Sequence, residues 1–170
     1  MKVKDGGIID TIFIYSIVTR FQLSVERKMI DWITLGENLL KLAISLALSL
    51  PVAWNRERST HIMGLRTYPL VAIGCCGYVL VANAFLPESA ASAQARVLQG
   101  LISGIGFVGG GAILKNEDHV QGTATASSIW AIGAVGVAVA HESYEIAIVI
   151  ALVIFLLLRW LTPLKEKIDG

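Results

Sequence analysis

Arginines and a glutamate gather where a long apolar run gives way to a short connection. The residues concerned are Arg56, Glu57, Arg58, Gly64, Leu65, Arg66 and Thr67. Guanidinium groups pair with carboxylates and phosphates through a fixed fork of N–H donors. Glu57 can pair with one arginine and leave cationic donors for a lipid phosphate or another anion, so we predict a functional loop here. The alternative is a positively charged anchor that only orients the chain in a membrane.

Small hydroxyl residues open a second apolar run, in the segment 122–130. Such hydroxyls bond the carbonyls of their own helix or bridge to a neighbouring helix. Trp130 adds an indole N–H donor inside the run, either as a packing residue or as part of a polar site. The candidate polar centre therefore comprises Thr125, Ser128 and Trp130.

Six glycines lie within residues 99–111. Pairs spaced by four residues let helix backbones approach closely in a membrane. The alternative is an unwound segment whose carbonyls line a polar site, as in transporters. We predict helix packing at Gly100, Ser103, Gly104, Gly106, Gly109 and Gly110, and we expect Gly104→Leu to disrupt the bundle.

Catalytic and metal-binding patterns are weak. No nucleophile, base and orienting group converge, so we predict neither an enzyme nor a cofactor, and no set of metal ligands can be assigned. The adjacent Cys75 and Cys76 lack a zinc-ligand spacing and are expected to be free, buried thiols. A formal net charge of +1 argues against nucleic-acid binding.

The composition predicts which elements hold these residues. Of 170 residues, 55% are hydrophobic and 16% are charged, against about 25% charged in a soluble domain. About 20 apolar residues cross a bilayer as a helix. Five stretches approach that length: 39–54, 70–86, 97–114, 123–140 and 144–161. We predict an all-α membrane protein, a compact bundle of about five transmembrane helices.

The basic residues predict an orientation. After residue 28, most of them fall in the first connection, in the third (Lys115) and after the last span (Lys165 and Lys167), whereas the second connection carries only Arg96 and the fourth carries none. The positive-inside rule then places these connections and the C-terminus in the cytoplasm. Within the first span, Lys41 is expected to extend toward the opposite membrane face, while Ser45 and Ser49 form a polar stripe that faces neighbouring helices.

The first 28 residues do not fit this orientation, because their basic side chains would lie outside. Their apolar run, 8–18, is too short to span a membrane. We hypothesise that translation begins at Met29; the alternative is an interfacial helix. The expected organisation is an N-terminal extension (1–28), a transmembrane domain (29–164) and a short cytoplasmic tail (165–170).

Two ordered signatures resemble those of the MgtC/SapB family, and the resemblance covers nearly all of residues 29–161. The first signature comprises Arg56, Glu57, Arg58, Gly64, Leu65, Arg66, Thr67, Leu70 and Val71. The second comprises Ser103, Gly104, Ile105, Gly106, Phe107, Gly109, Val120, Gly122, Thr125, Ala126, Ser128 and Trp130. The chain departs from the family pattern at Ala53, Asn55, Tyr68 and Thr123. The change at Asn55, where an acid is common, weakens a cation-binding role for the first signature.

The resemblance implies a small, multi-pass protein of a bacterial-type inner membrane. Family members act in adaptation to magnesium limitation or stress, more as regulators of other membrane proteins, including the F-type ATP synthase and transporters, than as pumps. Expected partners are therefore membrane lipids, other membrane proteins and a homo-oligomer. The alternative function is a transporter or channel component for magnesium or another ion. Many relatives carry a soluble C-terminal domain, and functions that depend on it are not carried over.

Overall fold

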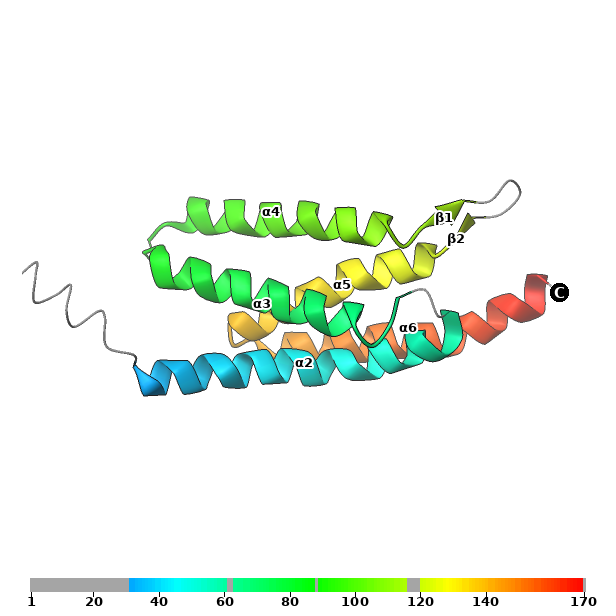
Figure 1. The fold of residues 1–170 in the computed structure, drawn as a ribbon, viewed down its shortest axis with the longest axis horizontal. Helices are drawn as coiled ribbons and strands as arrows, with labels where there is room; N and C mark the ends of the chain where they lie inside the picture. Colours follow the sequence, from blue (N-terminus) through cyan, green and yellow to red (C-terminus); the bar gives the residue numbers. More distant parts are fainter. Residues whose placement is uncertain (1–30, 61–62, 88, 116–119, 170) are drawn as a thin grey trace, which may run out of the picture. The chain divides into compact units, whose positions relative to one another are not determined.

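The apolar runs form helices in the computed structural model, which describes residues 31–60, 63–87, 89–115 and 120–169. In chain order the helices are α2 (Trp32–Thr60), α3 (Thr67–Phe85), α4 (Ala91–Gly110), α5 (Thr123–Ala140) and α6 (Tyr144–Asp169) (Figure 1). The predictions about residues 1–28, including a translation start at Met29, lie outside the described residues.

Within the described residues, four helices are long and apolar enough to cross a membrane: α2, α3, α5 and α6. The predicted all-α membrane bundle is confirmed. The third predicted span differs from the others: α4 has the length, 20 residues, but is not among these four. Polar residues such as Arg96, Gln99 and Ser103 alternate with its apolar ones and lower its hydropathy.

Helix α5 is the buried centre of the packing and contacts α3, α4 and α6. Its glycines allow neighbouring helices to approach closely. A Cβ built on Gly136 would overlap the carbonyl oxygen of Ala72 and lie 3.1 Å from the backbone nitrogen of Cys76. Helices α3 and α5 therefore touch backbone to backbone, which only a residue without a side chain permits.

The chain divides into two units, residues 1–37 and 38–170. In the first, Asp31 caps the start of α2: its carboxylate accepts the Ile33 N–H at 3.0 Å and the Thr34 hydroxyl at 2.7 Å. These hydrogen bonds, chiefly that from Thr34, lower the pKa of Asp31. An N-cap of this kind explains why α2 begins before the apolar run that marks its membrane-crossing part.

In the second unit, α2 presents a narrow buried stripe. Ser45, Ser49, Val52 and Ala53 have no exposed surface, so the predicted polar stripe of Ser45 and Ser49 is confirmed. Ser49 donates to the Leu46 carbonyl oxygen at 2.7 Å. This bond satisfies the hydroxyl within its own helix.

A short hairpin that the sequence analysis did not predict joins α4 to α5. β1 (Leu114–Lys115) pairs antiparallel with β2 (Val120–Gln121). Gly122 follows with φ +85°, and a Cβ there would overlap the carbonyl oxygen of Ala112. The left-handed conformation and the close approach both require glycine, and together they direct the chain into α5 at Thr123.

Candidate functional site

A tyrosine of α3 meets the hydroxyl residues at the start of α5. The Tyr68 side chain is fully buried, and its hydroxyl lies 2.6 Å from Ser128 Oγ and 3.4 Å from the Thr125 carbonyl oxygen. Ser128 Oγ lies 2.8 Å from the Ala124 carbonyl oxygen, to which it donates. Because a serine has one hydroxyl proton, Tyr68 is the donor to Ser128. The pair fixes α3 against α5 at this end of the bundle.

A buried arginine of α2 joins this pair. Arg56 is only 2% exposed. Its Nη1 lies 3.5 Å from Ser59 Oγ, and its positive charge interacts with the Tyr68 hydroxyl electrostatically. An arginine keeps its charge at any physiological pH, so burying it is costly and needs polar groups around it. We call Arg56, Tyr68, Thr125 and Ser128 the polar cluster.

A close contact between Glu57 and Gly64 shapes the connection that delivers Tyr68. Glu57 Oε2 accepts the Leu65 N–H at 3.0 Å, and a Cβ on residue 64 would come within 2.8 Å of Glu57 Cα. The Gly64 carbonyl oxygen then accepts the N–H groups of Thr67 and Tyr68, at 3.1 and 3.2 Å, as α3 begins. The expected pairing of Glu57 with an arginine is not found among the described residues. Its carboxylate instead accepts a hydrogen bond from the Leu65 backbone N–H.

The three arginines of the predicted functional loop lie in three different environments. Arg56 is buried, whereas the Arg58 guanidinium stacks over the Trp54 ring at 4.8 Å from its centroid. Arg66 occupies the N-cap position of α3, is exposed and forms no side-chain cap hydrogen bond. The loop residues are therefore not one anion-binding cluster: one arginine lies in the protein interior and two on its surface.

The predicted polar centre is found in part. Thr125 and Ser128 are 1% and 5% exposed and lie in the polar cluster. Trp130 is 53% exposed and does not join them, because it lies on the opposite side of α5. Tyr68 was not predicted as a partner of these residues. Its position at the start of a span, directly after Arg66 and Thr67, could have marked it as a candidate.

Most of the α4 glycines that were predicted to pack helices make no close contact within the chain. A Cβ on Gly100, Gly104, Gly106 or Gly110 would meet nothing within 4 Å. Only Gly109 is close to a neighbour, 3.0 Å from the Ala126 carbonyl oxygen. Ser103 is exposed as well. The spacing was right for helix packing, but within this chain the close contact is made by Gly136 of α5.

The described residues contain no group of three or more His, Cys, Asp or Glu side chains that could hold a metal ion. Cys75 and Cys76 are buried and free, as predicted.

An ion pair links α2 to the connection between α5 and α6. Lys41 Nζ lies 2.7 Å from Glu142 Oε1. Glu142, two residues after the end of α5, has φ +60° and donates its N–H to the Val139 carbonyl oxygen, while the Ser143 N–H donates to the Ala138 carbonyl oxygen. This is the Schellman arrangement, in which glycine usually takes the left-handed position. Lys41, which was expected to extend toward the membrane face, contacts this turn.

The ion pair should respond to acid. The hydrogen bond and charge of Lys41 lower the pKa of Glu142. The contribution of the ion pair to stability is therefore complete at neutral pH and is lost as the pH falls through the lowered pKa. We expect Glu142→Gln to lower the thermal midpoint slightly at pH 7 and to match the parent once the pH is below the lowered pKa of Glu142. Thermal unfolding of the detergent-solubilised protein checks this. A difference that stays the same across this range would contradict it.

Comparisons with known proteins identify a family and several relatives of this chain. A sequence profile described as the MgtC family matches residues 42–167. The chain is 32% identical over 134 residues to slr0014 of Synechocystis sp., covering 79% of this chain and 56% of that protein. It is 31% identical over 138 residues to Protein MgtC of Brucella abortus, covering 81% and 57%. With Protein SrpB of Synechococcus elongatus the identity is 29% over 130 residues, covering 70% of each.

The chain thus spans little more than half the length of two of these relatives. No solved structure matches it. The profile match includes α3, α4 and α5 in full, and also Glu142, whose ion-pair partner Lys41 lies one residue before the match. Because the profile covers well over half of the sequence, the chain belongs to the MgtC family.

Proposed function

We propose that this chain is a regulatory protein of a bacterial-type inner membrane that acts by binding other membrane proteins. The family resemblance supports a role in adaptation to magnesium limitation or stress. The observation that carries the proposal is an uncovered face of α4. The protein would bind its target through this face of α4.

That face is a stripe of small and polar residues: Gln99, Ser103, Gly106 and Gly110. Steps of four, three and four residues place them on one side of a helix. All four are exposed, and a Cβ on either glycine would meet nothing within 4 Å. Small residues allow another helix to approach, and serine or glutamine hydrogen-bonds across the contact. We call these residues the α4 stripe.

The orientation belongs to the same proposal. The polar cluster places the end of α2, the start of α3 and the start of α5 at one end of the helices, with Arg58 and Arg66 nearby in sequence. The positive-inside rule favours the cytoplasm for this end and for the C-terminus. A target protein would then meet the α4 stripe within the membrane.

A bulky side chain in the stripe tests the proposal. We expect Gly106→Leu to keep the amount and thermal stability of the protein, because space is open there. The variant should nevertheless fail to restore growth in low magnesium to a strain lacking the gene. A photo-reactive residue at Ser103 should form cross-links to a membrane protein that disappear in this variant.

Two controls sharpen the test. Gly77→Leu on α3 also enters open space but lies outside the stripe, so it should restore growth normally. Purified protein in vesicles should give no magnesium flux. Normal growth with Gly106→Leu, or flux that requires the chain, would contradict a regulatory role and favour the ion transporter.

A further inference from the structure

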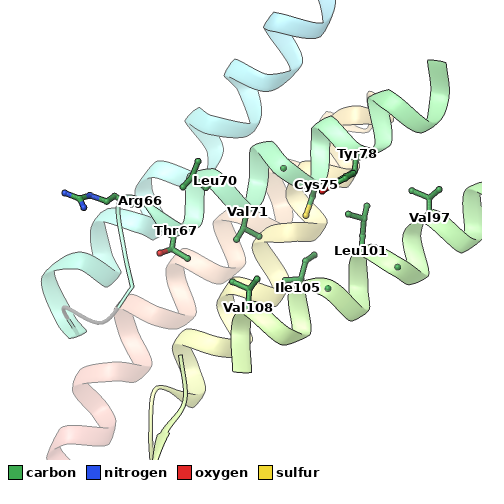
Figure 2. Close-up of a pocket in the computed structure, with 13 residues that line it drawn as sticks. Arg66, Thr67, Leu70, Val71, Cys75, Tyr78, Val97, Leu101, Ile105 and Val108 are labelled. Carbon is green, nitrogen blue, oxygen red and sulfur yellow. The ribbon is translucent and has the colours of Figure 1, made fainter. Parts of the chain in front are cut away.

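An apolar groove runs between α3 and α4. Its volume is about 760 Å³, and it extends from Arg66 and Val108 at one end to Tyr78 and Val97 at the other (Figure 2). The antiparallel helices supply both walls, and the apolar side chains labelled in Figure 2 dominate the lining. In a membrane, water does not stabilise such a surface, so hydrocarbon must fill it.

Glycines keep the groove open. Gly74 on α3 and Gly100 and Gly104 on α4 line it, and a Cβ on any of them would meet nothing within 4 Å. The groove therefore exists because three side chains are missing from its walls. The two α4 glycines are not part of the α4 stripe, because Gly100 and Gly104 lie on another side of the helix from Gly106 and Gly110.

The length of the groove fits one leaflet of a bilayer. Arg66 and Tyr78 are twelve positions apart, which corresponds to about 18 Å at 1.5 Å per helical residue. Half of a hydrocarbon core of about 30 Å is about 15 Å. A helix of a partner would cross the full thickness, whereas a lipid acyl chain reaches only this far.

Arg66 provides a positive charge at the end of the groove that lies nearer the membrane surface. Arg66 precedes the first residue of a membrane-crossing helix, and its side chain extends from the rim away from the apolar interior (Figure 2). Its side chain is exposed and forms no hydrogen bond or ion pair within the described residues, whereas Arg56 is buried. A guanidinium there can pair in a bidentate manner with a phosphate at headgroup level. The other end of the groove has no charged lining residue.

From this combination we propose that the groove binds one acyl chain of an anionic phospholipid, whose phosphate pairs with Arg66. The apolar walls hold the chain and the arginine selects the headgroup. The site is separate from the α4 stripe, so it stands whether or not the stripe binds a partner protein.

Native mass spectrometry of the detergent-solubilised chain with added phosphatidylglycerol tests the site. We expect one bound phosphatidylglycerol per chain. Arg66→Ala and Gly104→Leu should each lower its affinity about tenfold, the first by removing the phosphate partner and the second by filling the groove. Lys115→Ala, which removes another exposed cation, should leave the affinity unchanged. Thermal unfolding shows that each variant is folded.

Two further ligands distinguish recognition of the acyl chain from recognition of the phosphate. Glycerol phosphate should not compete, because it lacks the acyl chain. Diacylglycerol should bind more weakly than phosphatidylglycerol, because it lacks the phosphate. Competition by glycerol phosphate, or equal affinity in the parent, Arg66→Ala and Gly104→Leu, would overturn the proposal. A dimer that Gly104→Leu dissociates while lipid binding persists would overturn it too, by assigning the groove to a second copy.

Discussion

Replacing Gly136 with valine is expected to abolish the folded bundle. A Cβ at this position overlaps the Ala72 carbonyl oxygen, so α3 and α5 would have to separate. The atoms in the way belong to the backbone of α3, which cannot change rotamer as a side chain can. Overpacking a core costs about 3 kcal/mol or more when nothing can yield. Against a total stability of about 5–15 kcal/mol, this loss at the central helix contact is severe.

The measurement is the yield of monodisperse protein in mild detergent and its thermal midpoint. Gly77→Val is the matched control, because it makes the same change in a helix where space is open. It should not lower stability, because space is open there and valine has a higher helix propensity than glycine. Equal yields and midpoints for the two variants would show that α3 and α5 do not touch in the way described.

Arg56→Met should have the largest effect on function with little effect on folding. Methionine occupies similar space and removes a charge that is costly to bury, so the thermal midpoint should stay the same or rise. Tyr68 still donates to Ser128 in the variant. If the buried charge is used in regulation, the variant should fail to restore growth in low magnesium.

The competing explanation is that Arg56 only orients the chain. A reporter fused to the C-terminus separates the two: an unchanged orientation with lost growth assigns Arg56 a role beyond topology. Arg58→Met, which removes an exposed neighbouring cation, should keep both growth and orientation. Full growth with Arg56→Met would exclude a functional role for the buried charge.

Hydropathy was sufficient to locate the helices but not their ends. The bounds of α5, Thr123–Ala140, coincide with the predicted span because glycine precedes it and a tight turn follows. The predicted first span stopped at residue 54, whereas α2 continues to Thr60. An apolar run marks the part of a helix inside the membrane. Arginine and glutamate continue a helix readily outside it, so the helix extends past the run.

Which glycines pack could not be predicted from spacing. Gly100 and Gly104 in α4 have the spacing of a packing motif, but their side of the helix faces a groove. Gly136 makes the close contact because α5 lies at the centre of the packing. The same limit applies to the polar cluster. Thr125 and Ser128 were identifiable as helix hydroxyls, but their partner Tyr68 is about 60 residues away in sequence.

The modest hydropathy of α4 has a consequence for how the protein reaches the membrane. Helices enter the bilayer from the translocon according to their apolar content, and polar residues such as Gln99 and Ser103 make α4 the weakest candidate of the five described helices. During synthesis α4 emerges between α3 and α5, the two helices it packs against. We therefore expect α4 to enter the membrane together with its neighbours, so that biogenesis couples its insertion to completion of α5.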